Sequence, residues 1–327
     1  MKNYLFFAII ICLLFTSCVL IKPEAVSDGL SRKDYQPFKE GTKAVMLPEV
    51  ATLKLENNLP IIDGATALYP LYAAFVQAVY PQGEYSIWDT SFLDDDGKYV
   101  WITPIVRCTT TGGAYMSLIS GEVDIIFCAG PSDQQIEMAK YKGVEFNLTP
   151  IGKEAFVFFV NNRNPVSNLT TEQIKGIYSG KITKWREVGG KNKNIKAYQR
   201  SKNSGSQTML ESIIGDDVIM EPITEIALGM MDIINVTANY RNYNNAIGYS
   251  FLFYTTQMVR NNKIKLLSIN GVLPSPGSIQ AETYPYTDYF YAITTNTKNE
   301  NVGKFIEWIL SDQGQFLVKE TGYVPLR

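Results

Sequence analysis

Short apolar runs alternate with amphipathic segments along most of the 327-residue chain. In the first half, strand-like runs at 59–63, 100–108 and 124–129 are each followed by a helix-like segment, at 66–80, 113–120 and 132–141. The second half adds strands near 155–161, 195–200, 246–251, 263–267 and 286–295, and helices over 170–179, 204–214 and 301–319. Strands that alternate with helices are typical of a parallel sheet covered by helices. The pattern therefore predicts an α/β protein.

Local signals mark several element ends. Three helix starts pair a hydroxyl residue with a glutamine three positions later, which fits the capping box: Thr170 with Gln173, Ser132 with Gln135, and Ser204 with Gln207. Residues 88–101 are predicted to form a hairpin whose turn is the acidic stretch 94–97. That stretch lacks the alternating ligand spacing of a calcium loop, so no metal site is expected there.

The first 20 residues resemble an export signal. Lys2 precedes the apolar run 5–15, and Thr16-Ser17-Cys18 follows, which is similar to the lipobox of bacterial lipoproteins. We expect a signal peptide over 1–17, lipidation at Cys18, and a proline-interrupted tether over 18–58. An ordinary cleaved signal with an incidental cysteine is the alternative.

The composition excludes several chemistries. The chain has no histidine, which removes the usual general base at neutral pH, the Ser–His and Cys–His nucleophile pairs, and imidazole zinc sites. A formal net charge of −2 gives no sign of a basic face for a nucleic acid backbone. Gly189-Gly190-Lys191 resembles the end of a phosphate-binding loop, but Trp185 and Asn192 break the pattern, so no nucleotide site is expected.

Besides the lipidated Cys18, two cysteines remain in the predicted mature protein, Cys108 and Cys128. Each lies in or beside an apolar run, where a free cysteine packs as a small hydrophobic residue, and this favours two buried thiols. A disulfide is the alternative, because geometry decides pairing and the sequence does not show it.

Small hydroxyl residues lie next to glycine at three predicted helix starts, in segments 63–67, 109–113 and 203–207. A helix N-terminus offers unpaired N–H groups and the positive end of the helix dipole. Arg200, four residues before Ser204, would add a planar guanidinium suited to an oxyanion. Each segment alone is explained by helix capping, but the three together indicate an anion site.

The same segments resemble the phosphate-binding substrate-binding proteins of bacterial ABC transporters. The resemblance rests on Arg200-x3-Ser204-Gly205-Ser206, on Gly64-Ala65-Thr66 and on the threonines before Gly112-Gly113, and it extends over about residues 60–327. It implies a two-lobed, type II periplasmic-binding-protein-like fold with the ligand between lobes joined by two crossing segments. Lobe 1 is expected over 59–157 and 243–327, and lobe 2 over 158–242, with crossings near 158–161 and 243–247.

Carried over by position, the resemblance implies a phosphate site made of neutral donors and one arginine. The expected ligand-binding residues are Thr66, Ala67, Thr110, Thr111, Arg200, Ser204, Gly205 and Ser206. The family's well-known members also place an aspartate after the third strand to accept a phosphate proton. In this chain the corresponding stretch 124–132 ends without a carboxylate, and Asp133 follows inside a predicted helix start. Phosphate is therefore the expected ligand, and without this acceptor the site would discriminate less strongly against other oxyanions.

These features together predict a monomeric, lipid-anchored, extracytoplasmic receptor that passes phosphate to an ABC permease. It would lie at the cell surface or the periplasmic face and would use no cofactor or metal. Two alternatives from other classes stand beside it. One is a receptor-like lipoprotein that binds another oxyanion or acts as a sensor or scaffold. The other is a phosphatase-like enzyme, which the missing histidine disfavours.

Overall fold

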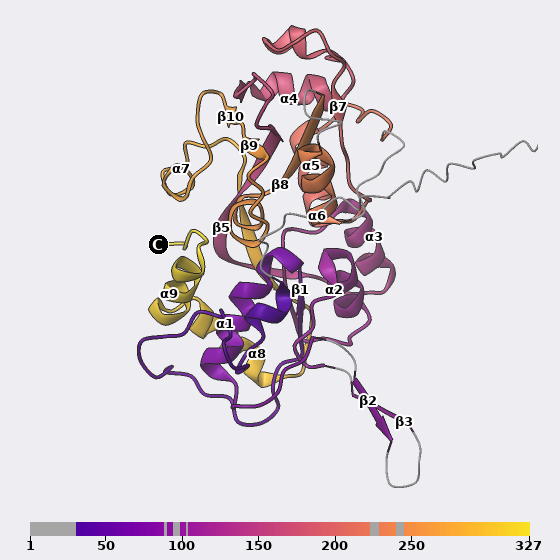
Figure 1. Cartoon of the computed structure of the whole chain (residues 1–327). Helices are drawn as coiled ribbons and strands as arrows, with labels where there is room; N and C mark the ends of the chain where they lie inside the picture. The colour runs from indigo at the N-terminus through magenta and orange to yellow at the C-terminus, as the bar shows by residue number, and fades with distance from the viewer. Residues whose placement is uncertain (1–30, 88–89, 94–98, 103, 223–228, 240–244) are drawn as a thin grey trace, which may run out of the picture.

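The computed structural model describes residues 31–87, 90–93, 99–102, 104–222, 229–239 and 245–327. The predicted signal peptide and the lipidation site at Cys18 lie outside these residues. The described part forms two α/β lobes, one above the other in Figure 1, with the long strand β5 (Asn147–Asn161) running through both.

Lobe 1 is built on the first half of β5 and three further strands. These are β1 (Ile62–Gly64), β4 (Ile125–Cys128) and β11 (Thr287–Thr294). Its helices are α1 (Tyr69–Val79), α2 (Thr110–Ile119), α3 (Asp133–Tyr141), α8 (Glu300–Ile309) and α9 (Asp312–Thr321). A hairpin of β2 (Thr90–Leu93) and β3 (Tyr99–Ile102) projects from this lobe, as predicted (Figure 1).

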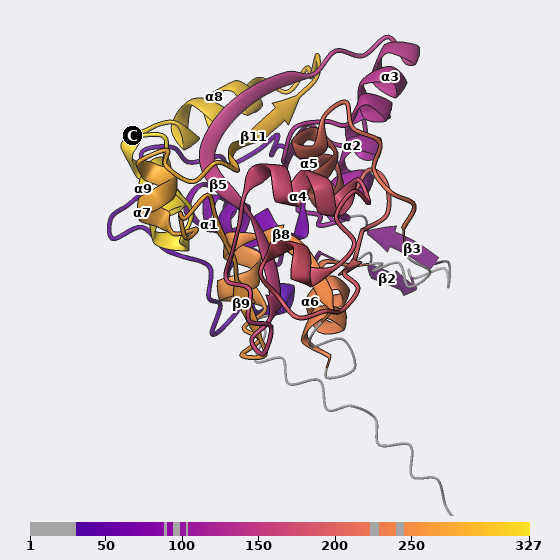
Figure 2. The ribbon, with the colours of Figure 1, turned by 90° about the horizontal axis from the view of Figure 1, so that it is seen from above.

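Lobe 2 is built on the second half of β5. It adds β7 (Lys196–Ala197), β8 (Ala246–Phe251) and β9 (Ile264–Leu266), with a small pair of β6 (Asn168–Leu169) and β10 (Ser268–Ile269). Its helices are α4 (Thr171–Tyr178), α5 (Gly205–Ile214) and α6 (Met230–Ala238), which surround β8 in the view of Figure 2. The short α7 (Pro276–Gln280) lies against β5.

The sheet is mixed, which corrects the prediction of a parallel sheet. Its strand order is β1-β4-β11-β5-β8-β7, with β9 also paired to β5. Only β1 with β4 and β7 with β8 pair in parallel within it, while β11 and β5 are antiparallel to their neighbours. The βαβ pattern predicted the parallel pairs correctly, but a strand that returns from the far end of the chain leaves no local signal of its direction.

One of the two segments that cross between the lobes does not lie where the resemblance implies. Strand β5 pairs with β11 up to Ala155 and with β8 from Phe156, so it passes between the lobes at this point. Strands β8 and β9 both pair within lobe 2, and the chain returns to lobe 1 where Tyr286 accepts a hydrogen bond from the Phe156 N–H at 2.8 Å. The described part of the boundary expected near 243–247 therefore falls inside lobe 2, and residues 243 and 244 lie outside the described residues.

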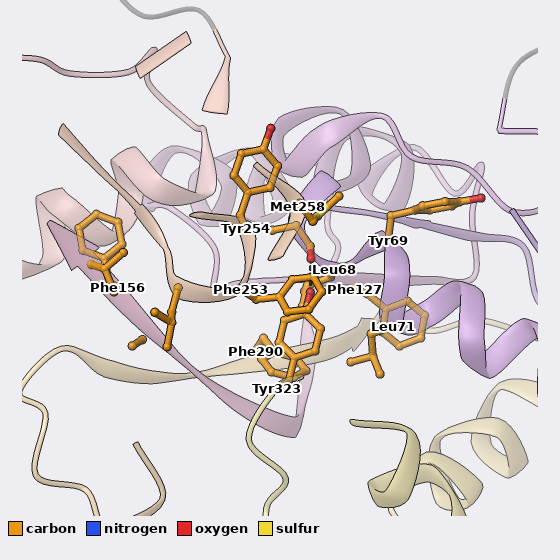
Figure 3. Close-up of a cluster of buried hydrophobic side chains, with 14 of the residues drawn as sticks. Leu68, Tyr69, Leu71, Phe127, Phe156, Phe253, Tyr254, Met258, Phe290 and Tyr323 are labelled. Carbon is orange, nitrogen blue, oxygen red and sulfur yellow. Dashed lines mark hydrogen bonds between the residues drawn. The ribbon is translucent and has the colours of Figure 1, made fainter. Parts of the chain in front are cut away.

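An aromatic cluster fills the junction between the lobes (Figure 3). The ring of Tyr323 stacks on Phe253 at 4.4 Å between centroids and meets Phe290 edge-on at 5.2 Å. The Tyr323 hydroxyl donates a hydrogen bond to the Ala67 carbonyl. The carboxyl-terminal segment thus fixes the turn that precedes α1.

Residues 31–58 are packed on lobe 1 rather than extended as a tether. Tyr35, Ala44, Ala51 and Leu55 are buried in the main core, and the Arg32 guanidinium donates to the Cys108 carbonyl at 2.9 Å. These apolar residues are too widely spaced to show a period, which is why the sequence pattern did not assign them to the core. The predicted tether over 18–58 differs from the structure in this second half.

Two further expectations concern caps and cysteines. The capping boxes at Ser132 and Thr170 are confirmed, whereas Ser204 caps α5 without the reciprocal bond from its own N–H to the Gln207 side chain. Cys108 and Cys128 are buried free thiols, which confirms the favoured alternative. In the part of the chain that the structure describes, no helix has the length and apolar character needed to cross a membrane.

Candidate functional site

A pocket of about 270 Å³ lies where the starts of α2 and α5 and the turn Thr66–Leu68 face one another. All eight residues predicted to bind a ligand line it: Thr66, Ala67, Thr110, Thr111, Arg200, Ser204, Gly205 and Ser206. The other lining residues are Ala65, Gly112, Ser201, Lys202, Asn203, Gly229, Met230, Phe251 and Tyr254. The three sequence segments therefore meet in one place, with contributions from both lobes.

Asp63 organises the lobe 1 side of this pocket. Its carboxylate is fully buried and accepts hydrogen bonds from the N–H of Gly64 at 2.7 Å and from the N–H and hydroxyl of Thr109 at 2.9 and 2.5 Å. Burial raises its pKa, and the bonds from Thr109 oppose that rise. The carboxylate thereby ties the end of β1 to the residue before α2 and positions the two threonines that follow.

The backbone at the start of α2 is strained. Thr110 has a φ of 74°, in the left-handed region that β-branched residues rarely adopt. Strain of this kind is maintained by the surrounding structure and is common at binding sites. Here it presents the exposed Thr110 at the pocket, beside the buried Thr111.

A hydrogen-bond network fixes Arg200 on the lobe 2 side of the pocket. The Arg200 N–H donates to Gln207 Oε1 at 3.0 Å and to the Tyr249 hydroxyl at 2.9 Å, and this hydroxyl donates to the same Gln207 oxygen. Arg200 Nη1 donates to Ser206 Oγ at 2.9 Å. Gln207 is thus engaged with the arginine segment, which explains why it does not complete a capping box.

The pocket is suited to an anion. None of its seventeen lining residues is acidic, and two of them, Arg200 and Lys202, are cationic. Burial lowers the pKa of Arg200, while the phenols of Tyr249 and Tyr254 and the Asp232 carboxylate raise it. A bound anion would offset the cost of desolvating this guanidinium, and the N-termini of α2 and α5 add N–H donors.

Arg107, Arg241 and Asp133 are weaker candidates for a role in an anion site. Arg107 forms an ion pair with Glu122 at 3.3 Å and is not among the pocket residues. Asp133 is the exposed first residue of α3 and does not line the pocket either. Arg241 falls outside the described residues. Sequence reasoning missed Phe251 and Tyr254, whose only signal is their place at the end of the strand 246–251 and three residues beyond it.

The two lobes touch across the pocket, so the structure is a closed form. Asn203 of lobe 2 accepts a hydrogen bond from Ser132 Oγ and donates to Gln134 Oε1, both at 2.9 Å, where α3 of lobe 1 begins. Gly205 approaches Thr111 so closely that a β-carbon there would lie 2.9 Å from the threonine hydroxyl. This glycine permits the approach.

We expect Gly205→Ala to raise the Kd for an anion in this pocket about three- to tenfold, because the added methyl meets Thr111 before the lobes close. Calorimetric titration measures the change. Gly303→Ala is the matched control, since no atom lies within 4 Å of a β-carbon at that position on α8. An affinity that is equal in the two variants would contradict the closure geometry.

Comparisons with known proteins agree with the fold. A family model described as a PBP superfamily domain matches residues 61–313. Protein SphX of Synechococcus elongatus is 26% identical over 82% of this chain and 84% of its own length. The phosphate-binding protein PstS of Staphylococcus saprophyticus is 27% identical over 66% and 69%. A Clostridium perfringens substrate-binding protein solved with bound phosphate has a TM-score of 0.60 at 21% identity and covers 81% of this chain and 98% of its own.

Proposed function

Because the chain belongs to the PBP superfamily, we propose that it captures inorganic phosphate between its lobes and delivers it to an ABC importer. The observation that supports this most strongly is the meeting of all eight predicted ligand residues in one pocket. The phosphate-binding names of similar proteins add weight, since sequence and fold are alike over most of the chain. The chain itself would perform no chemistry.

Capture proceeds by closure of the lobes about the crossing of β5 near Ala155. The anion would be held by the hydroxyls of Thr66, Thr110 and Ser204, by the N–H groups at the start of α5, and by the Arg200 guanidinium. We place the protein outside the cytoplasm as a monomer anchored through a lipid on Cys18. Its partner there is the permease of the importer.

The pocket has no acidic lining residue to accept a proton from phosphate. A dry site usually distinguishes protonated from fully ionised oxyanions by such an acceptor. We therefore expect sulfate, which carries no proton at neutral pH, to compete with phosphate more effectively than it would in a site that contains a carboxylate.

Isothermal titration of the purified protein with phosphate, and then with sulfate, tests the proposal. Saturable one-to-one binding of phosphate supports it. No heat and no thermal shift at about millimolar phosphate, a concentration at which even weak specific sites fill, would exclude it. Binding of sulfate alone would favour the receptor for another oxyanion.

Asn203→Gly removes the two side-chain hydrogen bonds to α3 and keeps the left-handed backbone, since Asn203 has a φ of 63°. Each such bond contributes about 0.5–1.5 kcal/mol, and values near the lower end apply because one of the two is exposed, so their joint loss should raise the Kd for phosphate about five- to tenfold. Titration measures it against Asn58→Gly, the same change at another asparagine with positive φ, on lobe 1. Equal affinities would show that Asn203 does not hold the lobes together.

A further inference from the structure

Glu154 lies on β5 at the point where the strand leaves lobe 1 for lobe 2. It is 8% exposed. Its Oε1 accepts hydrogen bonds from the N–H of Ala155 at 3.1 Å and of Phe253, just after β8, at 3.4 Å. One carboxyl oxygen therefore joins two backbone segments at the crossing between the lobes.

The other oxygen of Glu154 has a different environment. Oε2 is buried and has no hydrogen-bond partner among the described residues. Glu154 also lines a small cavity of about 30 Å³, whose walls include Ala65, Ala67, Thr111 and Phe251. These four residues also line the anion pocket, so Glu154 sits directly behind it. A buried carboxylate with an unpaired oxygen is costly, whereas the neutral acid costs much less.

The groups around Glu154 do not compensate a negative charge. On β11, Asp288 is its register partner and lines the same cavity together with Tyr289. The Tyr323 phenol has a pKa that is raised by burial and further by Glu154. Lys153, next to it on β5, is paired with Glu282. Burial raises the pKa of Glu154 to about 8.

We propose that Glu154 is a positioning residue whose carboxyl group holds a proton while the lobes are closed on the anion, and that its ionisation opposes closure. The inference rests on the proposed function and concerns the same pocket. A second negative charge behind the cavity would repel the anion, and the neutral acid removes that repulsion. Glu154 acts through the hinge and the pocket wall rather than by contact with phosphate.

The sign of the pH dependence follows from linkage. Opening hydrates the carboxyl group and lowers its pKa, so closure between the open-form and closed-form pKa takes up a proton. In that window the Kd for phosphate rises about tenfold for each pH unit, and below it the group is protonated in both forms and has no effect. Protonated Glu154 thus favours phosphate binding at low pH, and this favourable contribution is lost as the pH rises toward about 8.

The test compares the Kd for phosphate of the unaltered protein with that of Glu154→Gln from about pH 4 to pH 9, across the ordinary and the raised pKa of a glutamate. The titration of phosphate itself cancels in the ratio. We expect equal Kd values at the low end and at least a tenfold weaker Kd for the unaltered protein at the high end. Glu172→Gln, at an exposed glutamate of α4, should follow the unaltered protein throughout. A ratio that does not change with pH would overturn the proposal.

A second measurement needs no variant. With glutamate labelled by ¹³C at the carboxyl carbon, one resonance should titrate well above the others in saturating phosphate and at a lower pH without phosphate. If every glutamate titrates in its ordinary acidic range while phosphate is bound, the proposal is wrong. If one glutamate titrates high but phosphate has no effect on any resonance, the proposed capture of phosphate is wrong instead. The high pKa of Glu154 would then be a property of the closed protein that has no link to phosphate.

Discussion

Arg200→Ala is expected to raise the Kd for phosphate by about 10- to 100-fold. The guanidinium lines the pocket from the lobe 2 side and donates to Ser206, so it supplies the largest charge directed at the anion. Charge-assisted hydrogen bonds contribute about 1.5–3 kcal/mol, and neutral donors cannot replace them. Isothermal titration at constant ionic strength measures the loss.

Two further variants bracket this result. Arg186→Ala removes an exposed arginine of the same lobe and should leave the affinity unchanged. Lys202→Ala removes the other cation of the pocket, but this lysine is exposed, so we expect less than about a threefold effect. If Arg200→Ala binds phosphate as tightly as the Arg186 control, the anion does not bind where we place it.

Asp63→Ala is expected to have the largest effect on stability, lowering the free energy of unfolding by about 2–4 kcal/mol. The substitution leaves the N–H groups of Gly64 and Thr109 and the Thr109 hydroxyl without their buried acceptor. Phosphate binding should weaken as well, because the start of α2 loses the contact that positions its threonines. Denaturant unfolding and titration measure the two effects.

Asp63→Asn keeps the shape of the side chain but removes its charge. The amide oxygen can still accept from the backbone N–H groups of Gly64 and Thr109, and the NH₂ group faces the Thr109 hydroxyl, which can accept a hydrogen bond. We expect Asp63→Asn to lower the free energy of unfolding by less than half as much as Asp63→Ala. Asp133→Ala, at the exposed start of α3, is the control and should cost at most about 1 kcal/mol. A fully stable Asp63→Ala protein would show that this carboxylate does not organise the site.

Features with a local cause were predictable from the sequence. The caps at Ser132 and Thr170 depend on contacts within one turn, and the hairpin of β2 and β3 on neighbouring residues, so spacing alone indicates them. Three similar helix starts in one chain indicate an anion site, and the resemblance to phosphate-binding proteins implies its eight expected ligand residues. The two lobe 1 segments meet because Ile62 and Val106 form a parallel bridge, which brings the turn after β1 and the start of α2 to the same edge.

Features that depend on distant contacts were not predictable. The direction of β11 is set by partners more than a hundred residues away, and no pattern within 287–294 shows it. The bond between Asn203 and Ser132 and the position of Glu154 behind the pocket exist only once the lobes are assembled. Asp63 was noticed as part of a helix start, but its role as an acceptor requires Thr109 to be placed beside it.

The most direct test of phosphate capture is a crystal structure of the protein grown with saturating phosphate. The account predicts one tetrahedral anion between the lobes, in contact with the N-terminus of α5, with Arg200 and with the hydroxyls of Thr66 and Thr110. Phosphate bound elsewhere, or a pocket that stays without an anion while the protein binds phosphate in solution, would contradict it.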